Sequence, residues 1–194
     1  MPPREVYEGT AVTPAPPVMK QGEVWTVGAV ILNAQGHAFA QRRSPDRRLF
    51  PDTWDIVGGH VEPGESLLGA LAREIEEETG WRLRRVSAFL GVSTWTGDDG
   101  GGRRHEADWV VEVDGDLDHP ALEWSKHSAY DWFGAADLDR LKENCGPGEF
   151  LVHDLIAGVL LGPARGPRQG APHPSFVPST STWMARTAAP RAHS

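Results

Sequence analysis

The chain has 194 residues, a formal net charge of −8 and a single cysteine, Cys145. This length favours one compact domain, and the negative charge argues against a general nucleic-acid-binding surface. One cysteine excludes an internal disulfide framework and is typical of a reducing cytoplasm. Since no apolar run reaches membrane-spanning length and no secretion signal is recognised, we expect a cytoplasmic protein without a membrane partner.

The two ends of the chain differ in composition from its middle. Residues 1–21 are rich in proline and predict an extended lead-in, whereas residues 22–162 carry the apolar patterns of one folded domain. Residues 163–194 contain six prolines, four arginines and no acid, which predicts a flexible basic tail. Phe176 and Trp183 could carry this tail to the acidic body or to a partner chain, so a homodimer stays open. A tail without a role is the preferred interpretation.

Within the domain, short apolar runs alternate with helical patterns. The run from Glu23 to Leu32 predicts a buried strand, and Gly36 to Arg43 is expected to be its hairpin partner. A short strand at residues 54–57 precedes a helix that begins at Glu65 or Ser66 and ends at Gly80. Further strands are expected at residues 86–96, 106–113 and 130–133, and helices at 135–142 and 148–161. This order predicts a layered α/β domain around one sheet.

The predicted helix that stops at Gly80 ends in four glutamates, Glu74, Glu76, Glu77 and Glu78. Like charges three or four residues apart each cost roughly 0.2–0.5 kcal/mol, and the partial negative charge of a helix C-terminus disfavours acids further. At about 100° per residue, three of these glutamates share one side of the helix and Glu76 points away. Carboxylate oxygens suit Mg²⁺. A divalent cation site and a solvated acidic face are therefore the two interpretations of the cluster.

A longer pattern surrounds these glutamates. It consists of Gly59, Glu65, Arg73-Glu74-Ile75, Glu77-Glu78 and Gly80-Trp81. The pattern resembles the signature of the Nudix (MutT-like) hydrolases, which reads G, five residues, E, seven residues, R-E-U-x-E-E-x-G-U, where U is bulky and apolar. Every fixed position matches, although Trp81 is not the usual aliphatic residue. The order of predicted elements extends the resemblance to residues 22–162, and it implies a Nudix fold, a mixed β-sheet sandwiched between α-helices.

The resemblance also implies a chemistry. Relatives hydrolyse a phosphoanhydride in a nucleoside triphosphate or other nucleoside diphosphate derivative, with Mg²⁺ or Mn²⁺ offsetting the negative charge. By position in the motif, Glu74 and Glu78 match metal-binding glutamates, and Glu77 matches a third ligand or an outer-shell partner. The backbone carbonyl of Gly58 is expected to join the metal shell. Arg73 is expected to orient neighbouring carboxylates rather than to touch substrate.

The general base is where the sequence departs from the family pattern. In many relatives a glutamate lies in a loop shortly before a tryptophan of the next strand, but the position ahead of Trp132 is Lys126. Because a charged lysine cannot be a metal ligand, Glu123 in the same loop is the expected replacement. Rival candidates are two acids of an earlier strand and two of the motif, namely Glu106, Asp108, Glu74 and Glu77.

Basic and aromatic residues suggest how substrate is held. Arg42 and Arg43 are placed like the basic pair that approaches the phosphates in relatives, and Trp54 is a candidate to stack on a base, with burial as its alternative. Arg47 and Arg48 follow in a loop, where they are either solvated or clamp a far phosphate. The expected partner is a nucleotide or a nucleoside diphosphate-linked small molecule, and no signature fixes which one.

Three questions stay open at this level. The glycine-rich loop 97–105 is either a lid carrying Arg103 and Arg104 or a plain exposed hairpin. A prenyl-diphosphate isomerase on the same scaffold would need a cysteine–glutamate pair, and Cys145 comes far after the motif. A non-catalytic Nudix domain that senses a nucleotide or binds a partner is the other alternative, although such domains tend to lose motif acids that are all present here.

Overall fold

The computed structural model describes residues 16–96 and 102–162. Most of the predicted lead-in, the tip of the glycine-rich loop and the whole predicted tail lie outside the described residues. The strands are β1 (Val24–Ile31), β2 (Ala38–Arg43), β3 (Trp54–Asp55), β4 (Val57–His60), β5 (Arg82–Thr96), β6 (Arg103–Asp114) and β7 (His127–Phe133). The helices are α1 (Leu67–Thr79), the 3-10 helix η1 (Leu138–Lys142) and α2 (Leu151–Leu161). Within the described ranges, no helix has the length and apolar character needed to cross a membrane.

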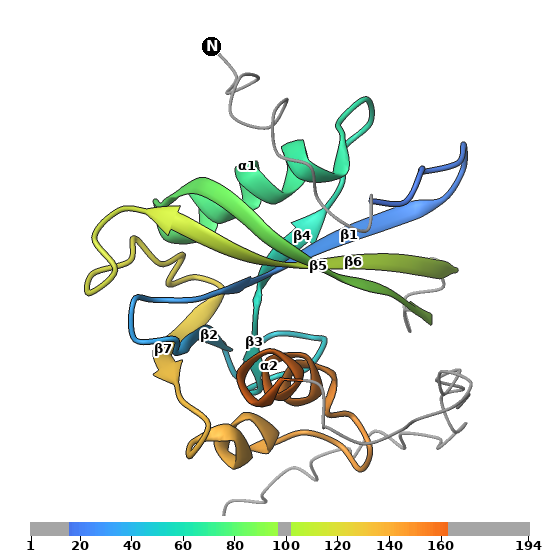
Figure 1. Ribbon diagram of the computed structural model, residues 1–194. Coiled ribbons are helices and arrows are strands. Elements are labelled where there is room, and N and C mark those ends of the chain that lie inside the picture. The colour runs from blue at the N-terminus through green and yellow to red at the C-terminus, as the bar shows by residue number, and fades with distance from the viewer. Residues whose placement is uncertain (1–15, 97–101, 163–194) are drawn as a thin grey trace, which may run out of the picture.

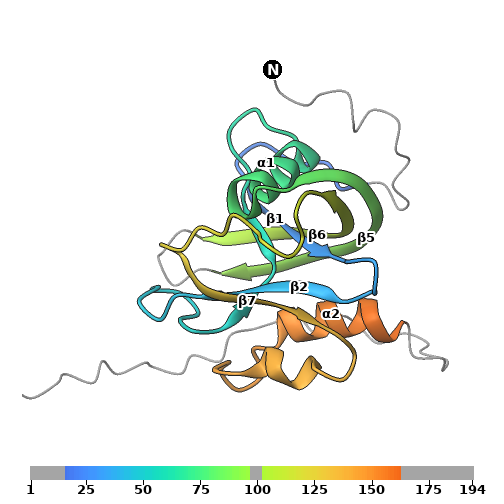
Figure 2. The same ribbon diagram turned by 90° about the vertical axis from the view of Figure 1, so that its left-hand side faces the viewer.

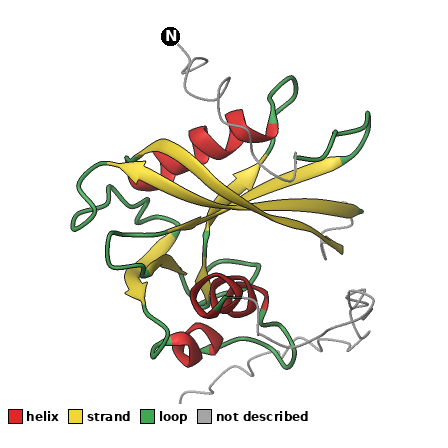
Figure 3. Ribbon diagram, viewed as in Figure 1, coloured by secondary structure: helices red, strands yellow, loops and turns green. Residues whose placement is uncertain are grey.

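The strands form two sheets that lie between α1 and α2 (Figure 1 and Figure 3). In the larger sheet, ordered β4-β1-β6-β5, β1 runs parallel to β6 and the other neighbours are antiparallel. The smaller sheet, ordered β3-β2-β7, is antiparallel. Figure 2 shows α1 on the outer side of the larger sheet and α2 beside the smaller one. The predicted fold class, a mixed sheet between helices, is confirmed, but the strands divide into two sheets.

Two predicted strand arrangements differ from the structure. The expected hairpin between β1 and β2 is reduced to one bridge, from Leu32 to Ala38, and β2 pairs instead with β3 and β7. Both edges of β1 are already paired, with β4 and β6, so β2 has no free edge of β1 to join. The predicted strand at residues 54–57 is divided between the sheets, β3 in the smaller and β4 in the larger.

The glycine-rich loop predicted at residues 97–105 and the helix predicted at residues 135–142 also differ from the structure. β6 already begins at Arg103, and Arg104 is only 8% exposed, with its guanidinium over the Trp95 ring at 4.8 Å. Arg104 is therefore a strand residue and not part of a lid. The helix expected at residues 135–142 is the short η1.

Alternation of side chains along β1 divides the apolar core into two clusters. Val27, Ala29 and Ile31 belong to the cluster that includes the apolar side of α1. Val30 points to the other side, into the cluster that includes Ile156 of α2. β1 is buried on both faces because one helix covers each side of the strands.

Helix α1 begins and ends as predicted. The Ser66 hydroxyl accepts a hydrogen bond from the Gly69 N–H at 3.1 Å, which caps the N-terminus. Gly80 ends the helix with φ 71°, a left-handed conformation that glycine adopts without steric cost. Between these ends the buried positions recur at helical spacing and include Glu78, so the core-facing side of the helix carries one carboxylate inward.

Candidate active site

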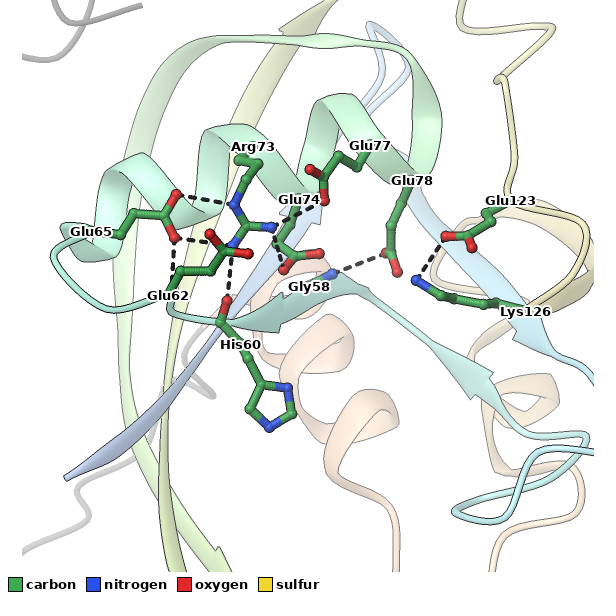
Figure 4. A network of polar contacts seen from close by, with 10 residues as sticks. All are labelled: Gly58, His60, Glu62, Glu65, Arg73, Glu74, Glu77, Glu78, Glu123 and Lys126. Atoms are coloured by element: carbon green, nitrogen blue, oxygen red, sulfur yellow. Dashed lines mark hydrogen bonds and ion pairs between the residues drawn. The ribbon is translucent and has the colours of Figure 1, made fainter. Parts of the chain in front are cut away.

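Arg73 lies at the centre of a network of carboxylates (Figure 4). Its guanidinium donates to both oxygens of Glu65 at 3.0 Å, to Glu74 at 2.8 Å and to Glu77 at 3.0 Å. A further bond, at 2.9 Å, reaches the backbone carbonyl of His60 on β4. Hydrogen bonds to Glu65 first, and then to Glu74, raise the pKa of Arg73, and the same contact lowers the pKa of Glu65. Arg73 therefore orients three acids and ties α1 to β4.

Glu74 lies against the backbone of β4. A Cβ added at Gly59 would come within 2.3 Å of the Glu74 carboxyl carbon, so the carboxylate occupies the space that any other residue at this position would fill. The Glu74 side chain is 13% exposed. Packing thus explains the glycine at position 59 of the motif, because the absence of a side chain lets the Glu74 carboxylate approach the strand.

Glu78 is the most deeply buried acid of the motif, at 6% exposure. Its Oε2 accepts a hydrogen bond from Gln41 Nε2 at 2.6 Å and one from the Gly58 N–H at 3.3 Å. Burial raises the pKa of Glu78 to about 7, although these two hydrogen bonds act in the opposite direction. The structure therefore places Gly58 and Glu78 together, and it adds Gln41, whose position between Ala40 and Arg42 in β2 gave no signal in the sequence.

Glu77 and Glu76 lie on more exposed parts of α1. The Glu77 side chain is 57% exposed and its only described contact is with Arg73. Glu76 is exposed as well. Of the motif acids, Glu77 can most readily contact solvent water.

Glu123 lies in the loop before β7 and forms an ion pair with Lys126 at 2.8 Å. This contact lowers the pKa of Glu123 and raises that of Lys126, which nearby Glu78 and Glu74 raise further. Figure 4 shows the Lys126 amine between Glu123 and Glu78. The predicted base is thus close to the motif acids, and a lysine engages its carboxylate.

The rival acids of β6 lie on the face of the larger sheet that points away from α1, because their neighbour Ala107 packs in the α1 cluster. Asp108 is 2% exposed, and burial together with Glu106 raises its pKa well above the usual range. Burial also raises the pKa of Glu106, to about 7, and its carboxylate accepts a bond from Trp95 at 2.9 Å. These acids do not join the Arg73 network.

The two arginines at the end of β2 contact different partners. Arg42 pairs with Asp52 at 2.8 Å, and its guanidinium lies over the Trp54 ring at 5.7 Å. Arg43 pairs with Asp55 at 2.8 Å and donates to the Leu49 carbonyl at 3.1 Å.

Trp54 is 5% exposed and packs edge-on against Phe133, with ring centroids 4.9 Å apart. Its indole N–H donates to Glu143 at 3.4 Å. These contacts give Trp54 a structural role in the α2 cluster, the alternative already open in the sequence.

The donor set near Gly58 has the chemistry that a hard divalent cation requires. Glu74 and Glu78 lie one helical turn apart, and Figure 4 shows both directed toward β4 at Gly58. In the described part of the chain no three His, Cys, Asp or Glu side chains are already arranged as a metal-binding group, and Arg73 engages two of the acids, Glu74 and Glu77. The raised pKa of buried Glu78 marks a carboxylate that a cation beside it would stabilise.

Known proteins resemble this chain in sequence and in fold. A family profile, the NUDIX domain, matches residues 22–152. The m7GpppN-mRNA hydrolase NUDT17 of Xenopus laevis is 45% identical over 75 residues, which are 37% of this chain and 25% of that protein. The nucleoside triphosphatase NudI of Enterobacter sp. (strain 638) is 41% identical over 58 residues, 30% of this chain and 41% of NudI. The matched parts therefore span less than half of either relative.

Solved structures extend the similarity over most of the described chain. The MutT protein from Methanosarcina mazei Go1 has a TM-score of 0.54 and 25% identity, covering 73% of this chain and 96% of that one. The MutT NUDIX hydrolase from Burkholderia pseudomallei has a TM-score of 0.54 and 26% identity, covering 68% and 95%. With the profile, the intact motif and the shared fold, the chain belongs to the MutT-like Nudix hydrolase family.

Proposed function

We propose that this protein is a Mg²⁺-dependent hydrolase that cleaves a phosphoanhydride bond in a nucleoside triphosphate or another nucleoside diphosphate derivative, by attack of water at phosphorus. The names of two relatives, a nucleoside triphosphatase and an m7GpppN-mRNA hydrolase, support this substrate class. The proposed partner is a nucleotide-linked small molecule, and the single cysteine supports a cytoplasmic location.

The observation that carries the proposal is the placement of Glu78. This buried carboxylate receives only neutral N–H donors in its hydrogen bonds, from Gln41 and Gly58, and it lies at the edge of a network of four further acids held around Arg73 and Lys126. Such a cluster is costly unless positive charge is supplied to it. Glu74, Glu78 and the Gly58 carbonyl would hold Mg²⁺, or Mn²⁺ in its place, with Glu77 as an outer partner. When bound, the ion offsets the charge of the diphosphate and lowers the pKa of a bound water.

The side chains of the protein supply position and proton transfer. Arg73 fixes the directions of Glu74 and Glu77 through its guanidinium, and Gln41 fixes that of Glu78. Glu77, the most exposed acid of the network, accepts the proton of the attacking water. Arg43 lies on the strand that carries Gln41 and would approach the phosphates.

The test is release of phosphate or pyrophosphate from a panel of nucleotides in the presence of Mg²⁺, with the parent chain and Glu78→Gln. We expect Glu78→Gln to lose most turnover, about a hundredfold or more, while circular dichroism shows an unchanged fold. Glu76→Gln is the matched control, because Glu76 is exposed on the same helix. Equal turnover of parent and Glu78→Gln would contradict the proposal, and no turnover of any nucleotide by the parent would favour a nucleotide-sensing domain.

A further inference from the structure

A second feature lies beside the carboxylate network, in a pocket of about 320 Å³. Two loops form it, the one that follows β2 and the one that precedes β7. Its lining residues are Arg43, Asp46, Arg47, Arg48, Leu49 and Ser125. The Ser44 N–H donates to the Lys126 carbonyl at 2.9 Å, so the backbone itself holds the two loops together. The volume is at the lower end of roughly 300–1,000 Å³, the range of small-molecule sites.

The pocket is positively charged in a protein whose formal net charge is −8. Three of its lining residues are arginines and one is an acid, Asp46. Arg43 is already held by Asp55 and by the Leu49 carbonyl, which fixes its guanidinium at the pocket wall. Arg47 is exposed, and its guanidinium forms no hydrogen bond or ion pair with another residue in 16–96 or 102–162. A local excess of arginine in an acidic protein favours a small anion rather than an extended polyanion.

One loop carries residues of both the pocket and the candidate active site. Ser125 of the pocket precedes Lys126, whose amine pairs with Glu123 at 2.8 Å; this contact first, and then the charges of Glu78 and Glu74, raise the pKa of Lys126. A substrate with its diphosphate at these glutamates would therefore have its neighbouring groups at Ser125 and the arginines.

We propose that this pocket binds a second phosphate group of the substrate, one that is not itself attacked, through Arg43, Arg47 and Arg48. The proposal rests on the proposed function, since it assigns a substrate class to the same site. Arginine suits the role because its planar fork matches the oxygens of a phosphate. The second phosphate is either the terminal one of a triphosphate chain or one on the sugar, and both present the same chemistry to the pocket.

Three matched substrates distinguish these sources: a nucleoside 5′-diphosphate, its 5′-triphosphate, and the 5′-diphosphate that carries an extra 3′-phosphate. We expect one of the two longer substrates to have a KM about tenfold below that of the plain diphosphate, as for one hydrogen-bonded charge pair. Preference for the triphosphate assigns the terminal phosphate, and preference for the 3′-phosphorylated substrate assigns the sugar phosphate. Equal KM values for all three would overturn the proposal.

The variant that tests the pocket is Arg47→Ala, with Arg84→Ala as the control. Arg84 is an exposed arginine of β5 that pairs with Glu112, outside both the network and the pocket. We expect Arg47→Ala to abolish the preference for the longer substrate while the fold is kept, because the replacement of an exposed side chain seldom affects folding. Arg84→Ala should keep the parental preference. A parental preference in Arg47→Ala would refute the assignment.

A binding measurement separates this proposal from the proposed function. Calorimetry with inorganic pyrophosphate, without a divalent ion, should give a Kd about tenfold weaker for Arg47→Ala than for the parent and for Arg84→Ala. If the nucleotide panel shows no turnover while this difference is present, the proposed function fails and the pocket stands. If turnover is present but the three proteins bind pyrophosphate equally, the pocket fails and the function stands.

Discussion

At the scale of single residues, two opposing effects act on the pKa of Glu78. Burial between α1 and the strands favours the neutral form of its carboxyl group, more strongly than the N–H donors of Gln41 and Gly58 favour the charged form. The pKa of about 7 therefore lies far above the ordinary 4.5. A group whose pKa is raised by folding stabilises the folded state only while it is protonated.

From the raised pKa of Glu78 we predict how the stability of the protein depends on pH when a chelator keeps metal ions away. The stabilisation from the Glu78 proton is complete below about pH 4.5 and is lost as the pH rises through about 7. Since Glu78→Gln carries no such proton, its free energy of unfolding should rise relative to the parent by about 3 kcal/mol between these limits. Urea unfolding at both ends of this pH range measures the difference.

Glu76→Gln is the control for this experiment, because it makes the same substitution at an exposed position of the same helix. A difference between Glu78→Gln and the parent that does not change with pH would show that Glu78 is not buried as an acid. Saturating Mg²⁺ should reduce the pH dependence if the ion binds the charged form.

At the scale of elements, the two glycines of β4 meet different neighbours. A Cβ at Gly59 would overlap the end of the flexible Glu74 side chain, at 2.3 Å, whereas a Cβ at Gly58 would overlap the Val27 carbonyl of β1, at 2.2 Å. A side chain can turn away at little cost, but a paired strand cannot. A substitution at Gly59 should therefore affect the site, whereas a substitution at Gly58 should affect the fold.

Gly59→Ala should thus reduce turnover at least tenfold while changing stability by less than about 1 kcal/mol, because the displaced Glu74 leaves its place beside Arg73. Gly58→Ala should cost roughly 1–3 kcal/mol of stability through the backbone overlap. Gly158→Ala in α2, where an added Cβ meets nothing within 4 Å, is the control without a clash, and it should raise stability by about 1 kcal/mol because alanine favours a helix over glycine. Thermal unfolding and nucleotide turnover of the three variants check this. Full activity of Gly59→Ala would contradict the placement of Glu74.

Elements with local signals could be predicted from the sequence, and those that depend on distant partners could not. Helix α1 is set by its own caps, Ser66 and Gly80, so its ends were predictable. The division at residue 56 was not, because only the remote partners of β3 and β4 assign them to different sheets. Gln41 was missed likewise, since its hydrogen bond to Glu78 spans 37 positions in the chain.

At the scale of the whole molecule, the candidate site lies where the two sheets meet. Glu78 belongs to the helix on the larger sheet, and Gln41 belongs to the smaller one, so their hydrogen bond joins the two halves. The two apolar clusters meet at β1, whose alternate residues enter one or the other. This shared strand predicts that the described domain unfolds as one cooperative unit.

Ile156→Ala tests that cooperativity from the side farthest from the carboxylates. Ile156 is fully buried in α2, within the cluster that holds Trp54, while Trp81 and Trp109 report on the α1 cluster. We expect a loss of about 2–4 kcal/mol, typical for a buried isoleucine, with tryptophan fluorescence and far-ultraviolet circular dichroism giving one coincident transition. Turnover at low temperature should remain near the parental value, since α1 and α2 lie on opposite sides of the strands.

Leu161→Ala, exposed on the same helix, should change stability by less than about 0.5 kcal/mol. Two separate transitions for Ile156→Ala would mean that α2 and the smaller sheet unfold independently of the helix that carries the motif, and the Gln41–Glu78 bond would then not couple the halves.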